Sequence, residues 1–518
     1  MYNIYVIILY TLVKATNGAR ILAVFPGPSI SHQVIFRPLT QELVRRGHQV
    51  TVITPNPTFE KGKGPENLTE IDVHDISYKM KEDFVETADF GRKDLVFDQI
   101  IHSLEQLSGI FADQTKSSDV QSILNDKNIS FDLLLIEACV RPTLIFSHLY
   151  KVPVIQVSSF GMMLGSAEIV GSPTHPFLYP TIMHQRLYNL SFWEKIDELY
   201  KHLKMKSMYD SSEFKELEMF ESILGVDLPS YNVLKNNVDM LFLNIHPIWT
   251  DNQPLPTNVI SIWGIHKTTL NELPQDLKSY LDSSKKGVIY MSLGSNAPSS
   301  RLPQEILQIF IRVFSQLQYD VLWKWEKDEL PGKPKNVKIS KWFPQSDLLY
   351  HPNIKLFITQ GGLQSTEEAI NAGVPLIGMP MHGDQWYNVE KYAHHRIGIR
   401  LEMDTLTETQ LKTTIDKVMM DKSYQENIVR LRSLLSDEPQ KALDRAVWWT
   451  EYVLRHGGAK HLRSPAANMS WMEYYEIQFI VTILLLIITC KIFIVIFLCF
   501  VWKYVLHNFI KKHKIKKS

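Results

Sequence analysis

Residues 20–54 read RILAVFPGPSISHQVIFRPLTQELVRRGHQVTVIT. The first six residues and residues 49–54 are short apolar stretches rich in β-branched side chains, which is typical of buried strands. Between them, residues 33–46 carry apolar side chains at helical spacing, and Gly47 is the kind of residue that ends a helix. Strand, helix and strand in this order predict a βαβ unit, which implies a parallel sheet.

The rest of the first half continues this pattern. Residues 131–136 and 154–157 are two more apolar stretches that we expect to be strands. Residues 161–240 are rich in aromatic, methionine and charged side chains with helical periodicity. We interpret this segment as a helical insertion that faces a pocket.

The second half begins the pattern afresh, and the two arrays join near residues 265–282. The expected strands are residues 287–292, 321–325, 337–342, 355–359 and 375–379, and the expected helices are residues 304–317 and 366–371. The chain is therefore expected to be an α/β protein with two facing Rossmann-like domains. In such folds ligands bind at the carboxyl ends of the strands, so we expect a site in the cleft between the domains.

The composition agrees with a two-domain globular protein, because 518 residues are too many for one core. Lys plus Arg equals Asp plus Glu at 55 each, which argues against nucleic acid as the main partner. Cys490 and Cys499 lie in an apolar C-terminal run, which leaves Cys139 alone in the rest of the chain. We therefore expect no intrachain disulfide and no zinc site built from cysteines.

The two ends of the chain predict a membrane-anchored protein. Residues 1–18 are a short apolar run followed by small residues, typical of a signal peptide, although no Lys or Arg precedes the run. Residues 477–501 are almost wholly apolar, interrupted only by Lys491, and long enough to cross a hydrocarbon core of about 30 Å. The basic tail that follows belongs in the cytosol by the positive-inside rule. We expect a single-pass type I protein whose body lies outside the cytosol.

Two further features bear on where the protein resides. Lys514 and Lys516 are spaced like the dilysine signal that returns membrane proteins to the endoplasmic reticulum, but positive-inside charge explains them equally well. Four N-glycosylation sequences fall on the side expected to be lumenal, at Asn67, Asn128, Asn189 and Asn468. We therefore expect the endoplasmic reticulum membrane, with lumenal domains.

Residues 359–370, TQGGLQSTEEAI, carry the chemistry. An apolar strand runs into two glycines and then into a helix that we expect Ser365 to open. Glycines let a ligand approach the backbone, and a helix N-terminus offers free N–H groups to an anion, so the segment can hold a diphosphate. Taken alone, an ordinary glycine turn would explain it better.

Two short motifs flank this segment, each just after an expected strand. Residues 342–345 read WFPQ and residues 383–385 read GDQ. An exposed Trp can stack on a uracil ring, and Gln and Glu side chains can bind a pyrimidine edge or ribose hydroxyls. Asp and Gln at the second motif can bind sugar hydroxyls.

Together, residues 342–385 resemble the signature of the UDP-glycosyltransferase family, a metal-independent inverting family with two Rossmann-like domains (GT-B type). The resemblance covers nearly the whole lumenal chain. Further matching segments are residues 31–32 (SH), 292–295 (SLGS), 444–449 (DRAVWW) and 455–462 (RHGGAKHL). The glycine segment is most similar to the insect branch, in which glucose is the usual sugar.

The resemblance implies a domain layout. The expected parts are a signal peptide (1–18), an N-terminal acceptor-binding domain (19–275), a C-terminal UDP-sugar-binding domain (280–450), a return helix and juxtamembrane segment (451–476), a transmembrane helix (477–502) and a cytosolic basic tail (503–518).

The resemblance also implies a role for each site residue. Trp342 stacks on uracil with help from Gln345, and Glu368 binds the ribose. Asp384 and Gln385 bind the sugar. The residues that face the diphosphate are Gln360, Gly361, Gln364 and Ser365. Ser292 and Ser295 lie on a second loop that contacts the nucleotide or its phosphates.

The catalytic base implied by the resemblance is His32, which we expect in the loop after the first strand. A histidine with a pKa near its ordinary value of about 6.5 suits proton transfer at neutral pH. The family pairs this base with an aspartate, but here Glu137 stands in that place and reaches one methylene further. Asp132 is the competing candidate, although it lies at the wrong end of its strand.

A second departure concerns Gln360, where the family usually has histidine. A glutamine can donate a hydrogen bond to phosphate but cannot become a cation. We therefore expect it to stabilise the diphosphate less than a histidine would, by roughly 1 kcal/mol or at most tenfold. No D-x-D triplet of the metal-dependent kind occurs in the chain, so no metal cofactor is expected.

The sequence therefore predicts an inverting transferase that moves a hexose, with glucose favoured, from a UDP-sugar to a hydroxyl of small lipophilic acceptors. Expected partners are these two substrates and membrane lipid around the C-terminal helix; a homo-oligomer stays open. A catalytically silent membrane glycoprotein that binds sugar nucleotides or small lipophiles is the alternative. An epimerase or phosphorylase is disfavoured by the two ends of the chain.

Overall fold

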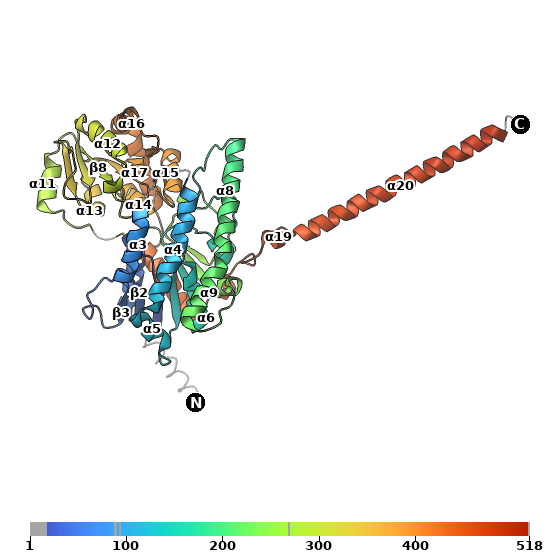
Figure 1. Cartoon of the computed structure of the whole chain (residues 1–518), viewed down its shortest axis with the longest axis horizontal. Helices are drawn as coiled ribbons and strands as arrows, with labels where there is room; N and C mark the ends of the chain where they lie inside the picture. Colours follow the sequence, from blue (N-terminus) through green and yellow to red (C-terminus); the bar gives the residue numbers. More distant parts are fainter. Residues whose placement is uncertain (1–17, 88–90, 93–94, 268–269, 516–518) are drawn as a thin grey trace. The chain divides into compact units, whose positions relative to one another are not determined.

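The computed structural model describes residues 18–87, 91–92, 95–267 and 270–515 (Figure 1). By its internal contacts the chain divides into two compact units, Met1–Ser464 and Pro465–Ser518. The expected signal peptide, apart from Gly18, lies outside the described residues, as does the very end of the basic tail.

The first sheet has seven parallel strands in the order β3-β2-β1-β4-β5-β6-β7. They are β1 (Arg20–Val24), β2 (Gln49–Thr54), β3 (Leu68–Asp72), β4 (Leu133–Glu137), β5 (Val154–Ser158), β6 (Val238–Leu243) and β7 (Val259–Ser261). The strand order reverses between β1 and β4, and the loops after these two strands therefore diverge from a common point. Such a switch point is where ligands bind in this class of fold.

The second sheet has six parallel strands in the order β10-β9-β8-β11-β12-β13. They are β8 (Val288–Ser292), β9 (Asp320–Lys324), β10 (Val337–Ser340), β11 (Ile354–Thr359), β12 (Leu376–Gly378) and β13 (Gly398–Arg400). Its switch point lies between β8 and β11, where Ser292 pairs with Thr359. The two-array, parallel-sheet fold expected from the sequence is confirmed.

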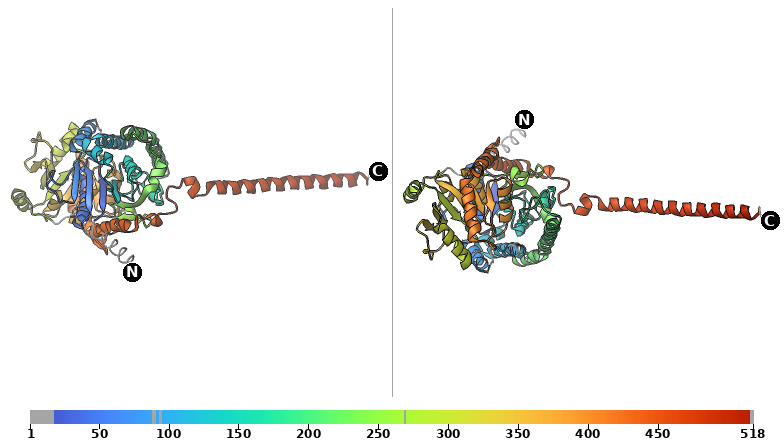
Figure 2. Two further views of the ribbon diagram at one scale, coloured as in Figure 1. Left: turned by 90° about the horizontal axis from the view of Figure 1, so that it is seen from below. Right: turned by 90° about the horizontal axis from the view of Figure 1, so that it is seen from above.

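Helices cover the faces of both sheets (Figure 2). Those of the first half are α2 (Ile30–Arg45), α3 (His74–Thr87), α4 (Val96–Lys116), α5 (Ser118–Asn125), α6 (Ile145–Tyr150), α7 (Ser166–Val170), α8 (Phe192–Ser211), α9 (Glu213–Leu224) and α10 (Tyr231–Leu234). Those of the second half are α11 (Gln275–Ser283), α12 (Gln304–Ser315), α13 (Gln345–Leu349), α14 (Leu363–Ala372), α15 (Gln385–His394), α16 (Glu408–Met420), α17 (Ser423–Ser436) and α18 (Ala442–His456). Short 3₁₀ turns are η1 (Arg141–Leu144), η2 (Lys235–Asn237), η3 (Pro247–Thr250), η4 (Ser299–Arg301) and η5 (Lys460–Leu462).

Two helices begin earlier than the sequence pattern indicates. α2 begins at Ile30, because the N–H groups of His32 and Gln33 both donate to the carbonyl of Ser29, which has the extended backbone of an N-cap. His32 therefore lies in the first turn of α2 and not in the preceding loop. α14 begins at Leu363 with Gly362 as its N-cap, so Ser365 is inside the first turn and does not open the helix.

The helical insertion expected over residues 161–240 is present as α7 to α10. The sequence pattern did not predict several helices, α3, α4, α5, α6, α11, α13, α15, α16 and α17, nor the strands β3, β6, β7 and β13. α4 runs through the middle of the first half beside α8 (Figure 1).

The chain returns to the first half near its end. α18 packs against α2 and buries Ala446, Val447 and Val453 in the same cluster as the β1 side chains Ile21 and Ala23. The expected boundary at residue 450 falls inside this helix. The return to the first half therefore begins with α18 itself and not after residue 450.

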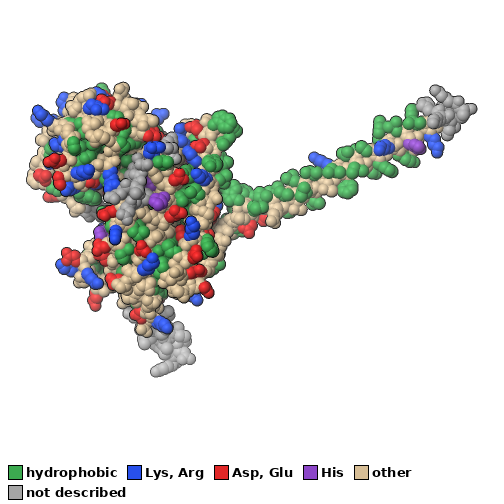
Figure 3. All heavy atoms as spheres, viewed as in Figure 1, with side chains coloured by type: hydrophobic (Ala, Val, Ile, Leu, Met, Phe, Trp, Pro, Cys, Tyr) green, Lys and Arg blue, Asp and Glu red, His purple; other side chains and the backbone are tan. Residues whose placement is uncertain are grey.

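The second unit consists of the short helix α19 (Trp471–Tyr474) and the long helix α20 (Ile477–Ile515). Apolar side chains cover α20 along most of its length (Figure 3). Residues 477–511 are long and apolar enough to cross a membrane, and this is a statement of length and composition only. α20 continues beyond the span expected to end at residue 502.

Candidate functional site

A cavity of about 500 Å³ opens at the carboxyl ends of both sheets, and its walls come from both halves of the first unit. Most residues predicted from the sequence line it: His32, Ser292, Ser295, Trp342, Gln345, Gln360, Gln364, Ser365, Glu368, Asp384 and Gln385. Two do not. Glu137 is completely buried behind His32, and Gly361 lies behind the cavity wall.

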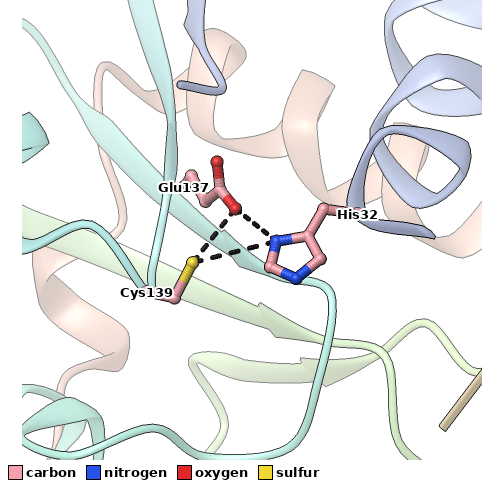
Figure 4. Close-up of side chains that lie close together, drawn as sticks. All are labelled: His32, Glu137 and Cys139. Atoms are coloured by element: carbon pink, nitrogen blue, oxygen red, sulfur yellow. Dashed lines mark hydrogen bonds and ion pairs between the residues drawn. The ribbon is translucent and has the colours of Figure 1, made fainter. Parts of the chain in front are cut away.

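The histidine and the carboxylate predicted from the sequence are in direct contact (Figure 4). Nδ1 of His32 lies 2.8 Å from Oε1 of Glu137. His32 is delivered by the first turn of α2 after β1, and Glu137 is the last residue of the neighbouring strand β4. A neutral imidazole that donates from Nδ1 to the carboxylate keeps its lone pair on Nε2, which is the nitrogen that can take a proton.

The longer arm of Glu137 is accommodated by Gly27. The backbone N–H of Gly27 donates to Oε2 of Glu137 at 2.9 Å. A Cβ atom on Gly27 would lie 2.8 Å from Oε1, so a side chain there would displace the carboxylate from its present position. The competing candidate Asp132 lies at the opposite edge of the sheet, where its Oδ2 accepts from the N–H of Arg20.

Cys139 is a third member of this group that the sequence did not predict. Its Sγ donates to Oε1 of Glu137 at 3.0 Å and lies 4.0 Å from Nδ1 of His32. Burial raises the pKa of Cys139 well above its ordinary value, and the charge of Glu137 raises it further. The thiol therefore keeps its proton and acts as a hydrogen-bond donor.

These atoms of His32, Glu137 and Cys139 lie within 4.8 Å of one another, a spacing that a metal ion could also bridge. The three side chains are, however, already joined by hydrogen bonds to Oε1 of Glu137, from Nδ1 of His32 and from Sγ of Cys139. The arrangement therefore fits a proton-transfer pair better than a metal centre.

The cavity residues that are expected to bind the nucleotide form a connected set of polar side chains. Nε2 of Gln345 donates to Glu368 at 2.7 Å and to Ser365 at 2.9 Å, and its Oε1 accepts from the hydroxyl of Tyr290. Burial raises the pKa of Glu368, and the hydrogen bond from Gln345 opposes this shift. Trp342 follows β10 and is 60% exposed, which leaves its indole free to stack on a ring.

Gln360 is held between two glycine backbones. Its Oε1 accepts from the hydroxyl of Thr359 at 3.0 Å, so the amide nitrogen is the group that points outward. A Cβ on Gly294 would lie 2.3 Å from this nitrogen, and one on Gly362 would lie 3.3 Å from it. The Gln360 amide thus joins the loop after β8 to the start of α14.

Gly362 provides no side-chain cap at the N-terminus of α14. The N–H of Leu363 contacts the carboxylate of Asp384, and the N–H groups that follow it in the first turn can be offered to an anion. The side-chain amide of Gln364 points elsewhere, because its Nε2 donates to the carbonyl of Ser159 in the first half at 3.0 Å. The φ angle of Gly361 is +89°, and a side chain there would collide with Val389 of α15. Gly361 therefore serves the packing of α14 against α15, while Gly362 lines the cavity.

Asp384 and Gln385, which the resemblance assigns to the sugar, both line the cavity. Oδ2 of Asp384 accepts from Asn388 at 2.7 Å, and burial raises the pKa of Asp384 to about 6. Oε1 of Gln385 accepts the N–H groups of Met381 and His382, which leaves its amide nitrogen to donate. One acceptor and one donor are thus presented side by side.

The opposite wall is apolar and comes mainly from α4, which the sequence pattern missed. Aliphatic side chains of this helix and of the segments after β5 line the cavity next to His32: Ile100, Leu104, Leu107, Ile110, Phe160, Met163, Ile182 and Met183. The apolar spacing within residues 96–116 is a helical signal that could have identified this helix. Nothing in that spacing shows that it faces a ligand.

Comparison with known proteins identifies the family of the chain. A family model described as UDP-glucoronosyl and UDP-glucosyl transferase matches residues 20–516. The chain is 34% identical over 505 residues to an ecdysteroid UDP-glucosyltransferase of Spodoptera littoralis nuclear polyhedrosis virus, covering 94% of this chain and 98% of that protein. It is 32% identical over 534 residues to UDP-glucosyltransferase 2 of Dactylopius coccus, covering 100% of both.

Solved structures show the same fold. Spinosyn forosaminyltransferase SpnP superposes with a TM-score of 0.54 at 18% identity, covering 84% of this chain and 99% of that one. The glycosyltransferase of kitacinnamycin superposes with a TM-score of 0.52 at 18% identity, covering 85% and 99%. Both are fold matches, and the two-domain GT-B arrangement is shared.

Proposed function

The chain belongs to the UDP-glucoronosyl and UDP-glucosyl transferase family, and from this premise we propose that it transfers glucose, with inversion, from UDP-glucose to a hydroxyl of small lipophilic acceptors. The observation that carries the proposal is the His32–Glu137 pair. It stands where an apolar wall meets a wall of nucleotide-binding side chains.

The reaction needs a base because an acceptor hydroxyl is a weak nucleophile at neutral pH. In the proposed step, Nε2 of His32 takes the hydroxyl proton as the acceptor oxygen bonds to the anomeric carbon. The bond from that carbon to the diphosphate breaks, and UDP leaves with the electron pair. Attack from the face opposite UDP inverts the configuration. Glu137 stabilises the imidazolium that forms, as a buried carboxylate does for other catalytic histidines.

Three features of the cavity support the proposed binding of the UDP-sugar. Trp342 is exposed for stacking, Gln345 and Glu368 form a polar pair for the ribose, and the start of α14 supplies N–H groups for the diphosphate. We propose that no metal takes part, because enzymes of this fold that use UDP-sugars generally need none. The leaving diphosphate would be stabilised by hydrogen-bond donors instead.

The proposed acceptor class rests on the α4 wall. Side chains such as Leu104 and Leu107 offer no hydrogen bonds, so an acceptor gains affinity there by burying apolar surface. A membrane anchor at α20 suits acceptors that partition into lipid. We further propose residence in the endoplasmic reticulum membrane, with the enzyme body in the lumen.

Microsomes containing the full chain test this proposal. We expect UDP release and glycoside formation with UDP-glucose and a panel of phenols and aliphatic alcohols, and little with UDP-glucuronate. His32→Ala should lower turnover by roughly 10²–10⁴-fold. A wild-type rate no higher than that of His32→Ala would favour a silent binding protein, and faster transfer from UDP-glucuronate would overturn the choice of glucose. NMR of the product would reveal retention, if it occurs, by the anomeric coupling.

A further inference from the structure

Lys81 is a cation in the wall of the cavity that the reaction described above does not use. It lies on α3 in the first half, and its Nζ donates to Oδ1 of Asn296 at 2.9 Å. Asn296 belongs to the loop after β8 in the second half, next to Ser295. The ammonium group therefore stands at the junction of the two halves, beside the loop that is expected to contact phosphate.

The charge of Lys81 has no carboxylate partner among the described residues. The groups in contact with it are the neutral amide of Asn296 and the ring of Tyr78, whose centre lies 5.2 Å away. Burial alone lowers the pKa of Lys81 to about 8. Lys81 is half-buried. A partly desolvated cation in a ligand cavity with no carboxylate partner is well placed to bind an anion.

Other lysines near the cavity differ in this respect. Lys324 also lines it, but its Nζ is bonded to the carbonyl of Gly294 at 2.8 Å and to Glu326 at 3.3 Å. Lys391 is paired with Asp251. Lys81 is thus the lysine whose charge is left for a ligand.

The donor groups around the expected diphosphate position are neutral. They are the amide of Gln360, the hydroxyls of the loop after β8 and the N–H groups at the start of α14. A diphosphate carries at least two negative charges, and more charge develops on it as the bond to the sugar breaks. Neutral donors stabilise such charge less than a cation does.

We propose that Nζ of Lys81 binds the diphosphate of the UDP-sugar and supplies the positive charge that Gln360 cannot. This inference rests on the proposed function, since it names a further ligand contact of the same site. The charge comes from the first half, whereas the other diphosphate groups come from the second half. Bound UDP therefore links the two halves, and the Lys81–Asn296 contact holds the cation close by when the nucleotide is absent.

Binding of uridine and of UDP to the full-length protein in detergent tests the proposal, measured by calorimetry without acceptor. Lys81→Met should weaken UDP binding by roughly tenfold or more and leave uridine binding unchanged, because uridine has no phosphate. Lys79→Met is the matched control, since Lys79 is an exposed lysine on the same helix. It should change neither affinity.

A second variant separates charge from structure. Gln360→His added to Lys81→Met should recover much of the lost UDP affinity at pH 6, where the new histidine is largely protonated, and little of it at pH 8. A merely structural role for Lys81 would show no such recovery.

Three results would overturn the proposal. The first is an equal loss of affinity for uridine and for UDP in Lys81→Met, and the second is an unchanged affinity for UDP. The third is a loss of affinity confined to UDP-glucuronate or to acidic acceptors, which would show that the cation binds a carboxylate. A wild-type protein that binds UDP but transfers no sugar would overturn the proposed function and leave this binding test intact.

Discussion

The pairing of Glu137 with His32 depends on two neighbours of the carboxylate, Gly27 and Cys139. Gly27 has no side chain, so the extra methylene of the glutamate finds space, and the Gly27 N–H fixes the second carboxylate oxygen. Cys139 donates to the oxygen that His32 also contacts. The carboxylate is therefore held by three donors, and its position is set by the backbone as much as by His32.

This geometry predicts different outcomes for two variants of Glu137. Glu137→Asp withdraws the carboxylate by about 1.5 Å, one C–C bond, from both His32 and Gly27, and we expect kcat to fall by roughly tenfold. Glu137→Gln keeps the length but loses the charge, and should lower kcat by roughly 10²–10⁴-fold. Steady-state rates with UDP-glucose measure both, with UDP affinity as the control that should not move. Normal turnover by Glu137→Gln would exclude the pair as the catalytic base.

Cys139 offers a chemical test of the same group. Burial and the nearby carboxylate raise its thiol pKa, so the thiol is protonated at neutral pH and should react slowly with iodoacetamide in the folded protein. Glu137→Gln removes the nearby charge, lowers the thiol pKa and should speed labelling several-fold. Mass spectrometry of the Cys139 peptide measures this, and the unfolded chain gives the reference rate. Fast labelling of the native wild type would contradict the hydrogen bond.

At the residue scale, most of the residues named from the family resemblance line one cavity, because motif residues at the carboxyl ends of parallel strands lie at the same edge of a sheet. His32 and Glu137 meet since β1 and β4 are neighbours. The packing roles of Gln364 and Gly361 could not be predicted in the same way. Their partners, Ser159 and Val389, are distant in sequence, and only the folded chain brings them together.

At the scale of elements, the starts of α2 and α14 do similar work in the two halves. Each follows a strand at the switch point of its sheet and places expected site residues within its first turn. The sequence pattern placed both starts late, because Ile30 and Leu363 are single apolar residues followed by polar ones and show no helical spacing by themselves. α4 was not predicted although its residues show helical spacing. Its place in the cavity wall could not be predicted from that spacing, because it depends on packing against α3 and α8.

The structure distinguishes three of the four glycosylation sequences. Asn67 precedes β3, and its Nδ2 donates to the carbonyls of Val44 and His48 at 2.8 Å each, so the nitrogen that would carry a glycan is already used. Asn128 and Asn189 are exposed. We expect glycans at these two positions and none at Asn67. Each Asn→Gln variant, run on a gel before and after glycosidase digestion, measures this. A mobility change for Asn67→Gln would contradict it.

At the scale of the whole molecule, every site residue lies within Met1–Ser464, and α20 is the membrane-span candidate among the described residues. A chain that ends at residue 476 is therefore expected to bind UDP with the affinity of the full chain but to leave the membrane fraction. Sedimentation after carbonate extraction and calorimetry measure the two effects. Persistent membrane attachment would show that α20 is not the anchor.

The two halves of the first unit are joined by two covalent crossings. The chain passes from β7 to α11, and it returns between α17 and α18, whose side chains complete the core around β1. Side chains of both halves also share one buried cluster, in which the indole N–H of Trp249 in the first half donates to Oδ1 of Asn388 in the second half. The halves are therefore fastened by packing outside the cavity as well as by the two crossings. A ligand that enters the cavity thus meets walls that are already assembled and does not have to bring them together.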